Sequence, residues 1–498
     1  MISETSGGFS QGDNGEDCVK KAIASFFNCI AVTLMTLCLT MCIIGVLYKQ
    51  SGYFRAFDMM IGLTALAIEI VFLFYLSAKA KSDRHALGVI SAISIVVLFS
   101  WNCVFDPKPV SDYAVLVEGA QQIINGSFVQ RVSEPSDYFS IYNFQIGYAF
   151  YLSVLLRVFN GSLNALRNVQ IVVVILTGIV IYKTFRLYFS VRKSLFSALL
   201  FVLFPYIFLG SGILNNQHES LLFIALAVYV FLAHRTYRGC MLSASLLSIG
   251  NVLRPTSTIV WCALVATTII YGFVYRKREC FVRAFVQMIT FIALSGLING
   301  AFILLEYAPK GINAENLWFK VLLGLTGKGL TGQVSTDAIH TNLYYDLLHY
   351  DFDYVSYQLA AKNYLLELIK NHTLDYRWIG KSFLDFLGGI DNQVYYGNED
   401  FVSQNWLLMN VLNVVGTGIY AISLISSLFT AVRRKIIDNP LLVVTALIFG
   451  GYFFVYLVFE KQTRYRYEQY YALFLFGIPM LIEALQMITQ RMKRCFFR

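Results

Sequence analysis

The sequence predicts an all-α polytopic membrane protein, a bundle of about twelve transmembrane helices with surface-lying helices in its outer loops. Three observations predict this fold class. Hydrophobic residues make up 57% of the 498 residues and charged residues only 14%, whereas an ordinary soluble domain carries roughly 25% charged residues. The apolar residues gather in runs of about the 20 residues that a bilayer crossing needs. Basic residues stand in short clusters between these runs.

Twelve runs are long and apolar enough to be read as spans. The run at 141–158 is also apolar, but Gln145 and Arg157 interrupt it, so we expect a helix that lies on the membrane surface or re-enters the membrane. The predicted spans are 24–48, 57–78, 86–105, 168–184, 195–210, 220–234, 239–253, 257–275, 281–305, 405–430, 440–459 and 470–489.

The basic clusters predict the orientation in the cell membrane. With twelve spans, every cluster that follows an even-numbered span falls on the same side as Lys20 and Lys21. Cytoplasmic loops are enriched in Lys and Arg, so we expect both termini in the cytoplasm and an extracytoplasmic active face. The basic residues form no continuous face, so the net charge of +9 does not predict a nucleic-acid partner. The nine cysteines form no metal-spaced cluster, and we expect neither a disulfide nor a zinc site.

The same pattern divides the chain into five parts. Two long segments fall on the outer side, and loops of this length in compact proteins are usually functional. Helix-like sequence at about 356–370 suggests a small cap on that side. The expected parts are a disordered cytoplasmic tail at 1–22, two N-terminal spans at 23–85, a core at 86–305 with a first outer loop at 106–167, an extracytoplasmic loop or cap at 306–404, and C-terminal spans at 405–498.

The first outer loop carries the sharpest functional signal. Asp106 and Asp112 follow the third span, and apolar residues recur at helical spacing directly after them, which predicts a helix on the membrane surface. Ser111 or Asp112 would be its N-cap. The N–H groups and the dipole of the helix would keep Asp112 ionised and fixed, as a general base requires. The alternative is that Asp112 only caps the helix.

Aromatic and amide side chains crowd the same face. A sugar needs polar partners for its hydroxyls and aromatic faces against its ring, so this mixture favours a sugar site. An ordinary interfacial belt of aromatic residues is the alternative. The candidate sugar- or acceptor-binding residues are Tyr113, Tyr138, Tyr142, Gln145 and His218.

Two stretches of this loop carry a resemblance to a known family. SDYAVLVEGAQQIINGSF at 111–128 and YFSIYNFQIGYAFYLSVLLRVFNG at 138–161 resemble the start of GT-C fold glycosyltransferases. In particular, they resemble bacterial relatives of the protein O-mannosyltransferase and aminoarabinose transferase superfamily. The resemblance implies a GT-C-like core at 86–305, with the catalytic aspartate at Asp112 and Asp106 as its competitor.

The chain departs from the family pattern in two places. Asn143 stands where proline is usual, and the loop follows the third span, although it follows the first in many members. The two spans at 23–85 would then be an N-terminal addition. Asp137 and Glu219 are further candidate acids, although Glu219 begins an apolar helix and so also suits a plain helix start.

Three arginines are candidates for binding phosphate. Arg254-Pro255-Thr256 resembles the R/K-P-T element of the superfamily, and Glu460 to Tyr471 resembles its E…RYR element. Arg464 and Arg466 would lie on the outer side, against the positive-inside trend, and planar guanidinium groups bind phosphate in a bidentate manner. Snorkelling of Arg254 and interfacial roles for the other two arginines are the alternatives.

The resemblance implies an inverting glycosyltransferase that uses a polyprenyl-phosphate sugar donor and a cell-envelope acceptor, which would be a glycan, a lipid or a protein. Membrane lipids would surround it. We expect no cofactor and no metal ion, although Asp351-Phe352-Asp353 has the form of a D-x-D metal motif. The main rival is a transporter or a lipid-linked-sugar flippase, but carriers usually show repeated halves and polar groups near mid-membrane. A polysaccharide polymerase and a scaffold without chemistry are the other rivals.

Overall fold

The computed structural model describes residues 13–50, 54–312, 317–328, 330, 346–390 and 397–496. Every regular element in these ranges is a helix, so the predicted all-α class is confirmed. Parts of the predicted cap at 306–404 fall outside the described residues, as does the start of the predicted tail.

Ten of the twelve predicted spans are confirmed as helices that are long and apolar enough to cross a membrane. Their length follows from the bilayer, since about 20 residues at 1.5 Å rise cover its hydrocarbon core. The ten are α1 (Asp13–Gln50), α2 (Ala56–Lys79), α3 (Asp83–Phe105), α8 (Leu163–Arg186), α11 (Asn216–Ala233), α13 (Ser257–Tyr275), α14 (Arg278–Leu304), α20 (Trp406–Arg433), α21 (Pro440–Val458) and α22 (Tyr467–Phe496).

The other two predicted spans occur as shorter helices. The run at 195–210 is divided into α9 (Val191–Val202) and α10 (Pro205–Phe208). Pro205 starts α10 at the position where a missing N–H costs least, and the residue before a proline disfavours helix, so the run breaks there. The run at 239–253 is α12 (Tyr237–Leu253), whose 17 residues are at the short end of what can cross.

The predicted tail at 1–22 needs a correction. Helix α1 begins at Asp13, so residues 13–22 are helical and continue directly into the first span. Uninterrupted helix-compatible residues between Asp13 and the apolar run allow the helix to extend towards the N-terminus, since no proline or capping sequence stops it. Residues 1–12 lie outside the described part of the chain.

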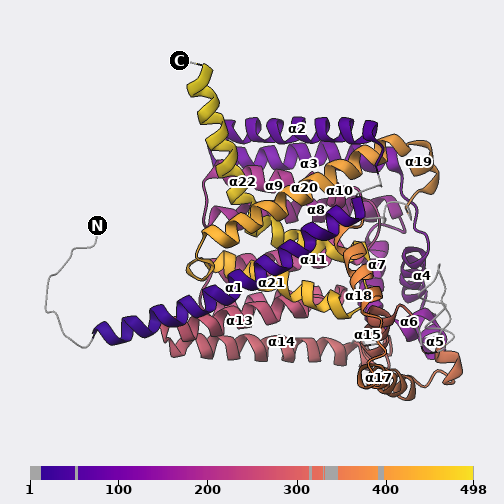
Figure 1. The fold of residues 1–498 in the computed structure, drawn as a ribbon. Helices are drawn as coiled ribbons and strands as arrows, with labels where there is room; N and C mark the ends of the chain where they lie inside the picture. Colours follow the sequence, from indigo (N-terminus) through magenta and orange to yellow (C-terminus); the bar gives the residue numbers. More distant parts are fainter. Residues whose placement is uncertain are drawn as a thin grey trace.

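The long helices run side by side, and the short helices gather at one end of them (Figure 1). The start of α1 and the end of α22 lie at the opposite end, as an even number of crossings requires. The assignment of that end to the cytoplasm stays a prediction. The short helices are α4 (Asp112–Asn125), α5 (Phe128–Ser133), α6 (Tyr138–Ile141), η1 (Asn143–Gln145), α7 (Ile146–Val158), α15 (Leu317–Thr326), α17 (Tyr354–Lys370), α18 (Tyr376–Gly388) and α19 (Glu399–Gln404).

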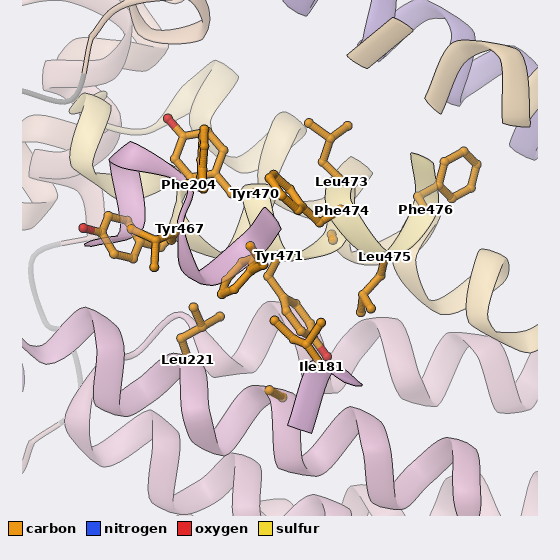
Figure 2. Close-up of a cluster of buried hydrophobic side chains, with 14 of the residues drawn as sticks. Ile181, Phe204, Leu221, Tyr467, Tyr470, Tyr471, Leu473, Phe474, Leu475 and Phe476 are labelled. Atoms are coloured by element: carbon orange, nitrogen blue, oxygen red, sulfur yellow. The ribbon is translucent and has the colours of Figure 1, made fainter. Parts of the chain in front are cut away.

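The core of the bundle is built around the first half of α22. Tyr467, Tyr470 and Tyr471 are fully buried there, and Figure 2 shows them beside Phe204 and Leu221. The ring of Tyr470 meets that of Phe204 edge to face at 5.0 Å, a favourable aromatic geometry. The start of α22 is therefore fixed firmly, which matters because the residues just before it enter the candidate site.

The outermost spans turn apolar side chains outwards. Val71 on α2 is 67% exposed, and Leu297 on α14 is 71% exposed. In water such surfaces would be unfavourable, but in a bilayer they meet lipid chains. This pattern agrees with a polytopic membrane protein, in which both faces of a peripheral helix are apolar.

The surface helix predicted after the third span is confirmed as α4. Leu116, Ala120 and Ile123 form its buried face, and they belong to a hydrophobic cluster shared with α7. The helix ends at Gly126, whose φ of 75° is the left-handed conformation that glycine adopts easily. The predicted membrane-surface or re-entrant segment at 141–158 is the short helix pair η1 and α7.

Candidate functional site

The candidate site centres on Asp112 and Arg464, which are 352 positions apart in the sequence. The Nη2 of Arg464 lies 3.4 Å from the Oδ2 of Asp112. Arg464 also donates from Nη1 to the hydroxyl of Tyr113 at 3.0 Å and from Nε to the Oε1 of Gln462 at 2.6 Å. The two charged side chains are 20% and 22% exposed. The structure thus brings together the predicted base, the predicted phosphate ligand and one predicted sugar contact.

Helix α4 determines where the Asp112 carboxylate stands. Asp112 is the first residue of α4, and Ser111 occupies the N-cap position with a φ of 51° and no side-chain capping bond. Of the two predicted N-cap residues, Ser111 is therefore the one that occupies the cap position, and Asp112 follows it as the first residue of the helix. Its carboxylate is directed to Arg464, close to the N-terminal end of the helix dipole, which favours the anion.

The neighbouring arginines of the last outer turn face opposite ways. They belong to the 3₁₀ turn η4 (Thr463–Arg466), in which residues two apart point in different directions because there are three residues per turn. Arg464 reaches the site. Arg466 is 1% exposed and donates to the backbone carbonyls of Leu387, at 2.8 Å, and Gly389.

The predicted phosphate-binding role of Arg466 is therefore corrected. Its guanidinium is satisfied by carbonyl oxygens inside the protein and is closed to a ligand from outside. It holds the end of α18 against the turn before α22. The RYR element alone does not predict which of the two arginines enters the site. The difference lies in the direction of each side chain, which is determined by the 3₁₀ turn.

Arg254 reaches the same site from the loop between α12 and α13. Its guanidinium lies over the ring of Tyr465 at 5.2 Å, and that of Arg464 lies 5.7 Å from the same ring. The Nε of Arg254 is 3.6 Å from a carboxylate oxygen of Glu468, which also accepts a bond from Thr256 at 2.8 Å. Glu468 is fully buried, so this pair is not a surface contact. Arg254 and Arg464 thus lie against the same aromatic ring, while phosphate binding by Arg254 stays a prediction.

Lys320 is a site residue that the sequence interpretation missed. It lies on α15 and forms an ion pair with Glu460, and its ammonium is 5.8 Å from the centre of the Tyr142 ring. Burial acts to lower the pKa of Lys320, but the Glu460 carboxylate, through its charge and its hydrogen bond, and Tyr465 together raise the pKa above its usual value, so the amine is charged. A single lysine inside the apolar run 317–326 was the available signal, since such a charge needs a partner.

Tyr138 and Tyr142 form the aromatic wall of the site. Their ring centres are 5.0 Å apart. Desolvation raises the pKa of both hydroxyls, and the negative charge of Asp112 raises them further. Both phenols are therefore protonated at neutral pH and can donate hydrogen bonds, as a sugar-binding tyrosine must.

The remaining predicted acids are engaged elsewhere. Asp106 pairs with Arg167 at 2.9 Å and is 64% exposed. Asp137 pairs with Arg131 at 2.6 Å and accepts a bond from the N–H of Phe139, so it caps α6. Neither carboxylate shares the ion pair of Asp112 with Arg464.

The residues predicted at the outer end of the sixth span lie deeper than expected. His218 and Glu219 are 2% and 3% exposed, inside the first turn of α11. His218 packs edge to face on Tyr467 at 5.0 Å, and Gln145 accepts a bond from Asn216 at 3.1 Å. His218 is thus enclosed by the protein, and its contact with a sugar or an acceptor stays a prediction.

The second aspartate of the D-x-D triplet, Asp353, has a local structural role. Asp353 is the N-cap of α17 and accepts bonds from the N–H groups of Val355 and Ser356. These bonds, together with that of the Ser356 hydroxyl, hold the pKa of Asp353 below its usual value. Capping explains this aspartate without a metal ion.

One comparison with known proteins bears on this geometry. Residues 146–298 match the family model described as dolichyl-phosphate-mannose-protein mannosyltransferase. The matched segment runs from α7 into α14 and contains Arg254, while Asp112 and Arg464 lie on either side of it. No curated protein matches the chain. The matched segment is less than half of the chain, and over residues 146–298 it agrees with the resemblance to GT-C glycosyltransferases predicted from the sequence.

Proposed function

We propose that the chain is an inverting glycosyltransferase that moves a sugar from a polyprenyl-phosphate donor to an acceptor hydroxyl at the outer membrane surface. The observation that carries this proposal is the contact of Asp112 with Arg464 at 3.4 Å. It brings a carboxylate suited to accept a proton beside a cation suited to hold a departing phosphate. The acceptor would be a glycan, a lipid or a protein of the cell envelope.

Two arginines and an aromatic ring would receive the donor phosphate. Arg464 and Arg254 both contact the ring of Tyr465, so a phosphate near this ring would meet both guanidinium groups. Charge-assisted bonds of this kind are about twice as strong as neutral ones. The polyprenyl chain would then extend into the bilayer along the apolar surface of the bundle.

The reaction would be a single displacement. The acceptor oxygen forms a bond to the anomeric carbon while the bond from that carbon to the phosphate oxygen breaks. Asp112 accepts the hydroxyl proton, and the phosphate keeps the bonding electron pair. Arg464 and Arg254 stabilise the charge that develops on the phosphate, which is often the largest catalytic contribution. Attack from the face opposite the leaving group inverts the anomeric centre.

The test is transfer of radiolabelled sugar from polyprenyl phosphates by purified protein, with Asp112→Asn compared with Asp106→Asn. A positioned general base contributes about 10²- to 10⁴-fold, so Asp112→Asn should lower transfer by at least about a hundred-fold. Asp106→Asn removes an exposed outer carboxylate of the same type and should leave transfer near the wild-type rate.

The result also separates the enzyme from the rival flippase. Full activity of Asp112→Asn would remove the assigned base. Movement of labelled donor across vesicles without cleavage of the sugar–phosphate bond would contradict an enzyme altogether. Folding of both variants is checked by thermal unfolding and by size-exclusion chromatography.

A further inference from the structure

The end of the bundle that carries both termini has an open cavity which the proposed sugar transfer does not use. It has a volume of about 570 Å³ and lies between the end of α20 and the part of α22 that follows Pro479. A proline inside a helix removes one hydrogen bond and bends the helix. In Figure 1 the C-terminal part of α22 projects from the bundle at this end. The cavity lies where α22, beyond Pro479, diverges from α20.

Positive charge dominates this cavity. Arg434 contacts both carboxylate oxygens of Glu483 at 2.7 and 2.9 Å, and Lys193 approaches the same carboxylate at 3.2 Å. Arg433 lies over the ring of Phe429 at 5.5 Å, and among the described residues no carboxylate pairs with it. Glu483 thus pairs with two cations, and Arg433 adds a positive charge to the lining that no carboxylate of the described residues balances.

The rest of the lining is suited to an amphiphile. Met480 and Met487 lie on α22 with the amide of Gln486 between them in sequence. Thioether side chains adapt to flexible apolar groups, while amides and guanidinium groups bind oxygen atoms. A free phosphate ion would use only the cations, whereas a phospholipid would use both kinds of surface. The cavity also lies where the span α20 ends at Arg433, which is the level of lipid headgroups.

We propose that this cavity binds the phosphate headgroup of an acidic phospholipid. Arg433 and the donors of Arg434 that Glu483 leaves free contact the phosphate, and the two methionines contact the glycerol and the first acyl carbons. This site lies at the end of the bundle opposite to Asp112 and is independent of the proposed glycosyl transfer.

Native mass spectrometry of the full chain tests the proposal. The protein is released from nanodiscs that contain equal parts of phosphatidylcholine and phosphatidylglycerol, and retained lipid is measured. The wild type should retain phosphatidylglycerol in preference to phosphatidylcholine. Arg433→Gln leaves the Glu483 ion pairs intact and should weaken that retention by roughly five-fold, since one basic residue near an anionic surface contributes about this factor.

A matched control uses basic residues at the same end of the bundle outside the cavity. Lys277→Gln, which removes one charge just after α13, should retain phosphatidylglycerol like the wild type. Equal losses in Arg433→Gln and Lys277→Gln would overturn the proposal, because general surface charge would then explain the binding. Equal retention of the two lipids by the wild type would overturn it as well.

A second arm separates the two sources of phosphate. Inorganic phosphate and glycerol phosphate are offered to protein in a neutral detergent, and the thermal midpoint is measured beside that with phosphatidylglycerol. A rise with the lipid alone supports a headgroup site with an apolar part. An equal rise with inorganic phosphate would contradict the lipid assignment.

Discussion

Replacement of Arg464 by Gln should lower sugar transfer strongly without unfolding the protein. The substitution keeps a polar side chain of moderate length but removes the positive charge and the bidentate fork. Arg464 gives hydrogen bonds to Tyr113 at 3.0 Å and Gln462 at 2.6 Å and an ion pair to Asp112 at 3.4 Å. If this group stabilises the leaving phosphate, its loss should cost about 3 to 4 kcal/mol in the transition state, or roughly 10²- to 10³-fold in kcat.

The stability cost of the same change should be moderate. The Arg464 and Asp112 side chains are only 20% and 22% exposed, so their ion pair is largely shielded from water. Leaving a buried partner without its hydrogen bond costs about 1 to 3 kcal/mol, and the glutamine amide can replace part of that bonding. Arg464→Lys keeps the charge but loses the fork, and we expect an intermediate activity, about ten-fold below the wild type.

Replacement of Arg466, which lies two residues further along the same 3₁₀ turn, is the matched control for Arg464→Gln. Its guanidinium is buried and satisfied by carbonyls, so Arg466→Gln should lower the thermal midpoint by leaving buried acceptors without donors, at about 1 to 3 kcal/mol each. The assay measures kcat with labelled donor and the thermal midpoint for both variants. Turnover near the wild-type rate in Arg464→Gln, or a pure loss of kcat with unchanged stability in Arg466→Gln, would refute the division of roles.

Two further predictions concern packing and pH. A Cβ at Gly147 would lie 2.1 Å from the backbone carbonyl of Val252, so Gly147→Ala should destabilise by about 1 to 3 kcal/mol, whereas Gly88→Ala, with nothing within 4 Å, should raise the thermal midpoint slightly. Burial lowers the pKa of Lys461 from 10.5 to about 8. Between these values the unfolded chain binds more protons than the folded one, so stability should increase with pH across that window. Lys461→Met should remove this increase, and an unchanged pH dependence of its thermal midpoint would contradict the assignment.

Much of the fold could be predicted because a bilayer constrains sequence strongly. Spans such as α21 are continuous apolar runs with clear ends, and Pro440 at the first helical turn gives the start directly. The start of α1 was harder to place. The residues between Asp13 and the span are compatible with helix as well as with a tail, and only the packing context distinguishes the two.

The site was predicted in part for a related physical reason. Asp112 and Arg464 could be recognised as candidates from the sequence. Asp112 is a carboxylate at a predicted helix start, and Arg464 is an arginine predicted on the side of the membrane that is usually poor in basic residues. Their meeting could not be derived, since it depends on how α4 and α22 pack. The pairing of Lys320 with Glu460 was missed because the two residues lie on separate segments of the chain, and only the fold brings them together.

The distance along the chain between Asp112 and Arg464 has a consequence for biogenesis. The ribosome must add 352 residues after Asp112 before Arg464 exists, and the final helix must then enter the membrane. Arg254 likewise waits for Glu468, the buried partner that α22 delivers. On the proposed function, a chain that terminates before the last helix would insert without its reaction centre. A nascent chain would then be unable to consume donor lipid before the final helix has entered the membrane.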